Sequence, residues 1–371
     1  MSYSVVPVSD KKGFDEFLRL PFDLYRGDPL WVPPLVAEVR RTLDPRRNPY
    51  FADAVLRLFV CHRDGRPVAR LAVVISGAHQ KAFGVRAAFF GFFESENDEQ
   101  AVQRLFAEAV TFCRDRNAEV LEGPFNPHHY SEIGLQIDRF GTAPSFFQPH
   151  NPPYYPELLE KAGFRISARL QTMANDDAGN DLARRFGDPP VTARRDGYTV
   201  RSFSPADKAR DLAFMREVNN DAFAENWHFL PLTPEEYAFS AKFMSYVTRP
   251  DLVKFVEYRG RPVAVLHCVL DVNPLLRRWN GAAGPVKLLR FLRGRRAVKT
   301  FILFTVAIER EHRRSCVSRL LLAEFCRMAR PFERAETTWI SADNRSALKA
   351  AASLGMRPDK HFAVYAKELG R

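Results

Sequence analysis

Paired cysteines and long apolar runs are both missing from this sequence, and each absence excludes a class of protein. The five cysteines are an odd number, and no two of them form a C-x-x-C pair. This spacing excludes a disulfide framework and the usual structural zinc sites, so we expect no metal. It is typical of a protein that stays reduced in the cytoplasm. The cysteines are Cys61, Cys113, Cys268, Cys316 and Cys326.

Segments that would carry the chain into or across a membrane are also missing. No stretch approaches about 18 uninterrupted apolar residues, the length that spans a bilayer. The N-terminal letters MSYSVVPVSDKKGF contain neither the apolar core nor the cleavage site of a secretory leader. The sequence therefore predicts a cytoplasmic protein, and contact with a membrane is expected to be peripheral.

The overall composition is that of a globular protein with a strong positive charge. The chain has 371 residues, of which 46% are hydrophobic and 27% are charged, enough for about two domains. The formal net charge of +11 favours a partner that is nucleic acid, an anionic membrane or an acidic small molecule. Phenylalanine is frequent, with 31 residues, and most of these rings are expected in the core.

The chain contains one internal repeat. The letters GRPVA occur at residues 65–69 and again at 260–264, a separation of 195 residues, and apolar segments flank both copies. Each copy predicts a strand, a tight turn and a strand. A second pair of segments begins at Asn151 and Asn344, 193 residues apart, and each continues as a short helix, a glycine and a large apolar residue. Two unrelated patterns at nearly one separation predict a duplicated domain.

Each half predicts the same order of elements. A helix comes first, then the hairpin, an apolar strand, an amphipathic helix, another strand, the Asn-headed helix and a last strand. The amphipathic helix of the first half is indicated by Val102, Leu105, Phe106 and Ala109, which recur at helical spacing. A segment rich in Gly, Pro, Asp and Arg predicts a linker at 181–197, between an N-terminal lobe (1–180) and a C-terminal lobe (198–371).

This order of elements resembles the fold of the GNAT superfamily of N-acyltransferases. The phrases YRGDPLWVPP (25–34), EGPFNP (122–127), NPPYY (151–155) and NWHFLP (226–231) resemble a bacterial family of two-lobed GNAT-like proteins. That family includes the bacterial ceramide synthases, which transfer an acyl chain from acyl-CoA to a sphingoid amine. The resemblance implies an α/β (α+β) protein with tandem GNAT-like lobes, each a twisted mixed sheet flanked by helices.

The resemblance also implies where acyl-CoA binds. A GNAT enzyme holds the CoA pyrophosphate in a loop of pattern [QR]-x-x-G-x-[GA] at a helix start, where backbone N–H groups and the helix dipole favour an anion. The C-terminal lobe has the first arginine of this pattern, but Cys316 and Ser318, which are also small, stand in place of its glycines. The alternative is a loop that no longer binds CoA. The predicted acyl-CoA contacts are Val306, Ala307, Ile308, Arg313, Arg314, Ser315, Cys316, Val317, Ser318, Arg319 and Asn344.

The N-terminal lobe does not offer a second site of this kind. At the equivalent place it carries the acidic letters ESENDE (94–99), which would repel a pyrophosphate. We therefore expect one acyl-CoA site, in the C-terminal lobe, and an N-terminal lobe that helps to form the acceptor site.

Candidate catalytic groups gather in the N-terminal lobe. An amine attacks a thioester only when it is neutral, so the reaction needs a general base. The loop PHHYSEIGL (127–135) contains titratable groups that can work near neutral pH, although a structural turn is the alternative. The tyrosine that the resemblance implies on the Asn-headed helix is replaced by Ala351 in the C-terminal lobe, whereas Tyr154 and Tyr155 occur in the N-terminal lobe. The catalytic candidates are Glu132, His129, His128, Tyr130 and Tyr154, and the acceptor-binding candidates are Asn126, Asn226, Trp227, His228, Asp271 and Asn273.

A basic segment interrupts the C-terminal lobe. Residues 277–299 carry eight Lys and Arg, and no Asp or Glu occurs between Asp271 and Glu309. The predicted insertion, 275–299, contains a helix that starts at Pro285 and places leucines on one side and basic residues on another. Such a helix is typical of an interfacial anchor on an anionic membrane, here the inner face of the cytoplasmic membrane. A solvated insertion, a clamp for CoA phosphate and a nucleic-acid patch are the alternatives.

Three functions follow from these patterns. The favoured prediction is an acyl-CoA-dependent N-acyltransferase that acts on a membrane lipid amine or sphingoid base. The second is a GNAT acetyltransferase for a soluble amine, and the third is a non-catalytic GNAT scaffold that binds acyl-CoA, lipid or nucleic acid. Nothing beyond charge indicates nucleic acid.

Overall fold

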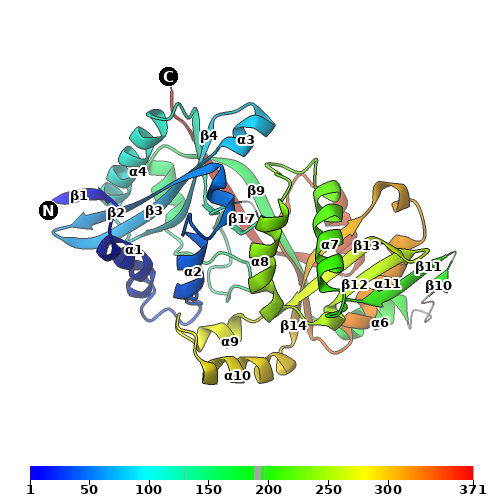
Figure 1. Ribbon diagram of the computed structural model, residues 1–371. Coiled ribbons are helices and arrows are strands. Elements are labelled where there is room, and N and C mark those ends of the chain that lie inside the picture. The colour runs from blue at the N-terminus through cyan, green and yellow to red at the C-terminus, as the bar shows by residue number, and fades with distance from the viewer. Residues whose placement is uncertain (129, 188–193, 196, 371) are drawn as a thin grey trace. The chain divides into compact units, whose positions relative to one another are not determined.

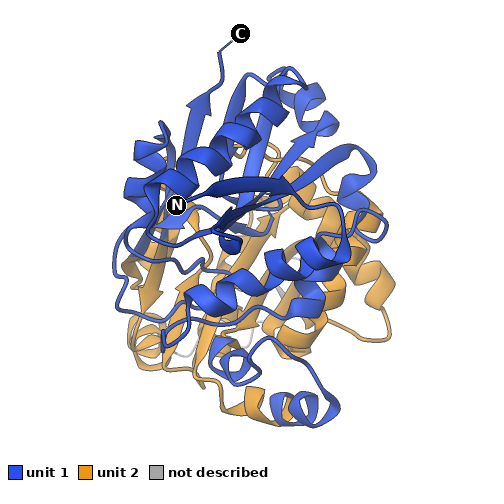
Figure 2. Cartoon of the chain, turned by 90° about the vertical axis from the view of Figure 1, so that its left-hand side faces the viewer, with its two compact units in different colours: residues 1–171, 273–291, 360–371 blue, residues 172–272, 292–359 orange. Residues whose placement is uncertain are grey.

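The computed structural model describes residues 1–128, 130–187, 194–195 and 197–370 (Figure 1). Contacts divide the chain into two compact units, which Figure 2 shows in different colours. Unit 1 comprises residues 1–171, 273–291 and 360–371, and unit 2 comprises 172–272 and 292–359. Two long strands contribute residues to both units: β9 (Arg165–Asn175) and β17 (Arg357–Glu368).

Unit 1 is built on a mixed sheet in the order β1-β2-β3-β4-β5-β17-β9. Strands β1 to β4 are antiparallel neighbours, β4 and β5 run parallel, and β17 pairs antiparallel with β5. The strands preceding β9 are β1 (Tyr3–Pro7), β2 (Ala54–Arg63), β3 (Arg66–Ser76), β4 (Ala87–Ser95), β5 (Val120–Gly123), β6 (Phe125–Asn126), β7 (Glu132–Ile133) and β8 (Leu135–Gln136).

Helices α1 (Lys11–Leu24) and α4 (Glu99–Arg114) of unit 1 pack against this sheet. The predicted amphipathic helix is α4, where Val102, Leu105, Phe106 and Ala109 are at most 1% exposed. Its start is fixed by Asp98, whose carboxylate accepts the N–H of Ala101 at 3.0 Å. The helices are α1 (Lys11–Leu24), α2 (Val36–Thr42), η1 (Pro49–Ala52), α3 (Gly77–Phe83), α4 (Glu99–Arg114), α5 (Tyr155–Lys161), α9 (Asn273–Arg277) and α10 (Pro285–Gly294), which ends in unit 2.

Unit 2 repeats the plan with a sheet in the order β9-β15-β14-β13-β12-β11-β10. Strand β14 runs parallel to β15 and antiparallel to β13. The strands are β10 (Arg194–Arg195), β11 (Tyr198–Ser202), β12 (Val253–Tyr258), β13 (Arg261–Leu270), β14 (Thr300–Ile308), β15 (Arg334–Thr337) and β16 (Ile340–Ser341). The helices are α6 (Ala178–Phe186), α7 (Lys208–Ala222), α8 (Pro234–Val247), η2 (Pro250–Leu252), η3 (Arg295–Ala297), η4 (Arg310–His312), α11 (Val317–Ala329) and α12 (Arg345–Ser353).

The two GRPVA segments are confirmed as equivalent hairpins. Strands β2 and β3 meet at Asp64 and Gly65, whose φ angles are 49° and 79°, and strands β12 and β13 meet at Arg259 and Gly260, with 51° and 83°. Two successive positive φ angles give the twist that joins antiparallel strands tightly. The Asn-headed segments are also confirmed as short helices, α5 and α12.

The segment predicted as the linker is partly helical. Its first residues, up to Phe186, belong to α6, which buries Ala178 and Leu182. Residues 188–193 and 196 of the predicted linker lie outside the described residues. All five cysteines are free and buried. None of the described helices has both the length and the apolar character needed to cross a membrane.

Candidate functional site

In unit 2, strand β14 has an open edge where the acyl-CoA arm was predicted. It pairs with β15 over Thr300–Leu303, and an irregularity opposite His267 and Cys268 then accommodates Phe304. Beyond that point, no described strand pairs with β14 on the β15 side. The N–H of Glu309 bonds to β13, at Val263 O, at 3.0 Å. Because backbone groups alternate between the two edges of a strand, Val306 and Ile308 direct theirs to the open edge.

The loop after β14 brings arginines to the end of this edge. Arg313 Nε donates to the carbonyl of Ile308 at 3.1 Å, and its guanidinium lies 3.6 Å from Asp221. The N-cap of α11 is Cys316, and the hydroxyl of Ser315 accepts the N–H of Val317 at 3.2 Å. Cys316 and Val317 are buried, whereas the predicted contacts Arg314, Ser318 and Arg319 are exposed. Backbone and cationic groups at this helix start are suited to an anion.

In unit 1 the equivalent edge is filled by the chain itself. Strand β4 pairs with β5 over Ala87–Phe89, and the chain after β5 then lies against the rest of β4. A Cβ on Gly91 would lie 1.7 Å from the carbonyl oxygen of Phe125, so only glycine allows this approach. The N–H of Phe92, which has a φ of 50°, donates to Asn126 Oδ1 at 2.6 Å. This edge therefore has no room for a pantetheine arm.

The acidic residues at the end of β4 and after it have partners within unit 1. Arg63 lies 2.6 Å from Glu96 and 2.5 Å from Asp98, and Asp98 caps α4. A carboxylate thus occupies the helix start at which a pyrophosphate would bind in a GNAT lobe. Both observations support the prediction that acyl-CoA binds in the C-terminal lobe alone.

The predicted catalytic loop forms the short hairpin β6–β7. Asn126 and Glu132 are paired residues of this hairpin, and Asn126 Nδ2 lies 3.3 Å from Glu132 Oε2. Solvent reaches Glu132, but protein surrounds it closely enough that desolvation raises the pKa of its carboxyl to about 7; the charge of Glu94 adds to the rise, and Asn126 opposes it. A carboxyl group with this pKa is suited to accept a proton near neutral pH.

The other residues of this loop have structural contacts. His128 Nδ1 accepts the N–H of Tyr130 at 3.2 Å, and the His128 ring packs edge-on against Tyr50 at 5.0 Å. Burial lowers the pKa of His128 to about 4, so its imidazole is neutral at physiological pH. His129 lies outside the described residues.

A buried polar network beneath this loop escaped the sequence analysis. Glu94 Oε2 accepts the hydroxyls of Tyr25 at 2.9 Å and Tyr155 at 2.8 Å, and Glu94 Oε1 lies 3.8 Å from Arg70. Burial raises the pKa of Glu94, whereas the Arg70 charge and the two hydroxyls oppose the rise. The signal in the sequence was Arg70, a single charge inside the apolar strand β3, because a buried charge needs a partner.

The asparagines that precede the two Asn-headed helices have different roles, and only the Asn-headed segment of unit 1 contains tyrosines. Tyr154 donates its hydroxyl to the carbonyl of Ser95 at 2.9 Å, and burial raises its pKa to about 12. Asn151 is buried and accepts the N–H of Gln136 at 2.8 Å, so it anchors β8. Asn344 instead caps α12 by accepting the N–H of Ala347 at 3.1 Å. A structural role for Asn344 is thus visible, and its contact with CoA stays a prediction.

The remaining acceptor-binding candidates fall in different units. Asn273 belongs to unit 1, where its amide donates to the carbonyl of Pro144 at 2.9 Å. Asp271 lies in unit 2 and is 9% exposed. The turn after α7 holds Asn226, Trp227 and His228, with the two rings 4.4 Å apart and His228 at a φ of 52°. Their role in binding an acceptor stays a prediction.

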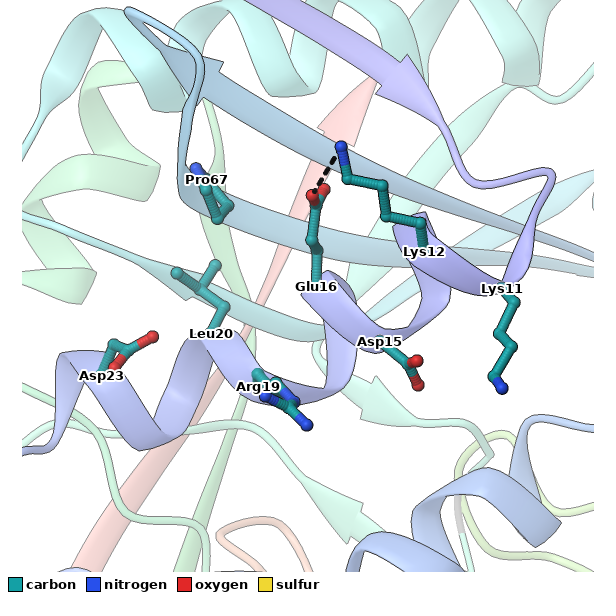
Figure 3. A pocket seen from close by; sticks show the side chains of 8 residues that line it. All are labelled: Lys11, Lys12, Asp15, Glu16, Arg19, Leu20, Asp23 and Pro67. Atoms are coloured by element: carbon teal, nitrogen blue, oxygen red, sulfur yellow. Dashed lines mark ion pairs between the residues drawn. The ribbon is translucent and has the colours of Figure 1, made fainter.

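A separate surface hollow of about 630 Å³ lies along α1 in unit 1 (Figure 3). Lys12 and Glu16 form an ion pair of 3.9 Å across it, and Glu16 also lies 3.0 Å from His62. Charges of both signs line the hollow, and none of the predicted site residues is among them. The lining residues are Lys11, Lys12, Asp15, Glu16, Arg19, Leu20, Asp23 and Pro67.

Comparisons with known proteins agree with this architecture. No family model matches the chain. The chain is 28% identical over 382 residues to the bacterial ceramide synthase of Caulobacter vibrioides (strain NA1000 / CB15N), covering 99% of this chain and 97% of the relative. It is 26% identical over 372 residues to Protein YghO of Escherichia coli (strain K12), covering 97% and 94%.

Solved structures show the same two-lobed fold. A tandem GNAT protein from the clavulanic acid biosynthesis pathway superposes with a TM-score of 0.60 at 16% identity, covering 100% of this chain and 99% of that one. A probable N-acyltransferase from Enterococcus faecalis V583 gives a TM-score of 0.57 at 10% identity, covering 100% and 73%. The fold is that of a tandem GNAT protein.

With the two curated relatives, these matches confirm the resemblance drawn from the sequence: the chain is a two-lobed GNAT-like protein. They also support its predicted class, an acyltransferase.

Proposed function

We propose that the protein is an acyl-CoA-dependent N-acyltransferase whose acceptor is the amine of a membrane lipid or sphingoid base. The observation that carries the proposal is the contrast between the two units. Strand β14 of unit 2 has an open edge beside exposed arginines, whereas the equivalent edge of unit 1 is filled by residues 123–126. One acyl-CoA site is the arrangement that a single acyl transfer needs.

In this proposal, unit 2 binds the donor through its backbone and its arginines. Val306 and the N–H of Ile308, whose carbonyl accepts Arg313 Nε, bond the amides of the pantetheine arm, as one more strand would bond an open sheet edge. Arg314 and Arg319 face the pyrophosphate at the start of α11, while Asp221 holds Arg313 in place at 3.6 Å. Cys316 and Ser318 are small enough for the backbone to approach a phosphate.

Unit 1 supplies the base. The neutral amine attacks the thioester carbonyl carbon, the new C–N bond forms, and the C–S bond breaks with release of the CoA thiolate. The proton lost by the amine passes to the Glu132 carboxylate, which is free to accept it above its pKa of about 7. This role requires that Glu132 and the thioester meet during turnover.

The lipid acceptor is proposed from the surface of α10 and from one relative. Val286 and Leu289 are 63% and 50% exposed on this helix, and Arg290 and Arg293 are exposed among them. Apolar side chains beside arginines on a solvent-facing helix fit the interface of an anionic membrane. The relative that is 28% identical is a bacterial ceramide synthase, an enzyme with a lipid product.

The experiment is free-thiol release by the purified protein with a series of acyl-CoAs, with and without sphingoid bases in mixed micelles. We expect thiol release that depends on a long-chain amine, with the N-acyl product identified by mass. Equal turnover of a soluble amine would support a soluble acceptor. Binding of acyl-CoA without turnover would support a non-catalytic scaffold, which the loss of the helix tyrosine at Ala351 favours.

A further inference from the structure

The hairpin β6–β7 contains an amide whose orientation is fixed by the backbone. The N–H of Phe92 can only donate, and it lies 2.6 Å from the side chain of Asn126. The atom that receives it must therefore be the amide oxygen, Oδ1. This assignment leaves the NH₂ group of Asn126 directed at Glu132, 3.3 Å from Oε2.

Both neighbours of this amide are rigidly placed. Phe92 lies at the irregular part of β4, where Gly91 packs directly on the carbonyl of Phe125. Asn126 and Glu132 are paired across the hairpin, which a second bond closes between the N–H of Gly134 and the carbonyl of Pro124 at 2.9 Å. Because the Phe92 N–H already fixes the Asn126 amide, the side chain of Asn126 loses little further conformational freedom when its NH₂ group holds the Glu132 carboxylate.

We propose that Asn126 is a positioning residue that holds the Glu132 carboxylate in the orientation needed to take a proton from the acceptor amine. The inference rests on the proposed function, because it assumes that Glu132 is the base. Asn126 itself touches no reacting atom in this assignment. It was predicted from the sequence to bind the acceptor, so the inference gives it a different role.

The groups around Glu132 determine in which direction its pKa should change when Asn126 is replaced. Glu94 on β4 adds a negative charge that raises the pKa of Glu132, whereas the Asn126 amide on β6 lowers it. On the same loop, His128 is held neutral because burial lowers its pKa to about 4. Loss of the amide donor is therefore expected to keep Glu132 protonated to a higher pH.

The test compares Asn126→Asp with Glu132→Gln and a control. Aspartate keeps an oxygen for the Phe92 N–H but replaces the NH₂ donor with a second oxygen facing Glu132. We expect thermal unfolding and the KM for acyl-CoA to stay at wild-type values, kcat at neutral pH to fall about 10-fold or more, and activity to recover as pH rises. The control is Asn180→Asp, because Asn180 donates to the exposed Asp177 at 2.7 Å, and it should change nothing.

Each outcome decides between two claims. A wild-type pH profile in Asn126→Asp, together with an inactive Glu132→Gln, would overturn the inference and leave the proposed base intact. An active Glu132→Gln would overturn the proposed base and the inference with it. An Asn126→Asp protein that unfolds at a lower temperature than the wild type, with an unchanged pH profile, would give Asn126 a purely structural role.

Discussion

At the scale of single residues, two carboxyl groups of unit 1 behave differently because of what surrounds them. Glu94 is enclosed and receives two tyrosine hydroxyls and the charge of Arg70. Glu132 remains accessible to solvent and receives one amide at 3.3 Å. A well-bonded, enclosed carboxyl stabilises a structure, whereas a sparsely bonded one with a raised pKa is the better candidate for chemistry.

This difference predicts the pH dependence of turnover. Desolvation and the charge of Glu94 raise the pKa of Glu132 to about 7, and a base works only when it is deprotonated. Activity should therefore be low below pH 7 and rise through about pH 7 to a plateau. A pH series of kcat/KM with a lipid amine measures this. A profile flat between pH 5 and 8 would contradict the role of Glu132.

The raised pKa of Glu132 also determines how this residue changes the stability of the folded protein with pH. The folded protein binds the Glu132 proton more tightly than the unfolded chain does, so this group contributes less stability as pH rises from about 4.5 to above 7. Because solvent reaches Glu132, we expect only a small increase in the unfolding temperature of Glu132→Gln above pH 7. A lower unfolding temperature would indicate that the carboxylate has a structural partner.

At the scale of elements, strand β14 offers neighbouring positions where a substitution should affect either acyl-CoA binding or the stability of the fold. Proline at Val306 removes an N–H that faces the open edge, whereas proline at Ala307 removes one that faces β13. Val306→Pro should weaken acyl-CoA binding about 5-fold or more and leave the fold intact, because a lost hydrogen bond costs about 1 kcal/mol. Calorimetric titration with acyl-CoA measures this change.

Two further variants complete that comparison. Val306→Ala keeps the N–H and should bind acyl-CoA like the wild type. Ala307→Pro should instead lower the unfolding temperature, because Ala307 is 1% exposed and pairs with Val265. Normal acyl-CoA binding by Val306→Pro would exclude the open edge as the pantetheine site.

The helix α10 allows a test of membrane binding that is separate from catalysis. Leu289→Asp should weaken binding to phosphatidylcholine vesicles that contain phosphatidylglycerol about 10-fold, because it loses apolar burial and repels the lipid phosphates. Arg290→Ala and Arg293→Ala should each cost about 1 kcal/mol in the same vesicle-flotation assay. Val85→Asp is the matched control, since Val85 is also exposed, at 43%, but lies away from α10 in the sequence. Equal binding by all four variants would contradict the proposed surface.

The anchoring of α10 explains why its apolar residues stay in solvent. Phe291 is its buried side chain, packed edge-on against Trp279 at 5.4 Å. Lys287 donates to the carbonyl of Trp279 at 2.7 Å, so this basic residue serves the local fold. The sequence predicted Leu288, Leu289, Phe291 and Leu292 as one apolar side, but only Phe291 of these is buried.

Local patterns in the sequence were enough to predict the elements, whereas several contacts around the candidate site depend on residues far apart in the chain. The hairpins and Asn-headed helices follow from local patterns, such as the residues Asp64 and Gly65, a pair that readily adopts the two successive positive φ angles found there. The bond between Phe92 and Asn126 joins residues 34 positions apart and depends on an irregular strand, which no local pattern announces. Likewise, the partners of Glu94, which are Tyr25, Arg70 and Tyr155, come from three separate segments of unit 1.

At the scale of the whole molecule, the two compact units do not coincide with the two halves of the sequence. Residues 360–371 belong to unit 1, where Tyr365 pairs with Gly123 of β5 and is 1% exposed. Lys360 is also buried there and donates to Gln148 at 3.1 Å. The predicted lobe boundaries at 180 and 198 describe the repeat in the sequence, and the division of the protein at these boundaries stays a prediction.

This arrangement predicts that a fragment of residues 1–180 is unstable by itself. A fragment of residues 1–180 lacks β17, so the β5 edge and apolar groups that contact Tyr365 are exposed. We expect it to aggregate, and a full-length chain with Tyr365→Asp should lose about 3 kcal/mol or more of stability. Size-exclusion chromatography and chemical denaturation measure the two effects. A soluble, cooperatively folding fragment would show that unit 1 does not need its last strand.

The position of strand β17 in the chain also affects how unit 1 folds during synthesis. Gly123 of β5 pairs with Tyr365 of β17, which follows it in the chain by 242 residues (365 − 123). At typical elongation rates of about 5–20 residues per second, the β5 edge is synthesised on the order of ten to fifty seconds before its partner. During that interval the unpaired edge is open to aggregation, and a slow codon between the two strands would lengthen its exposure.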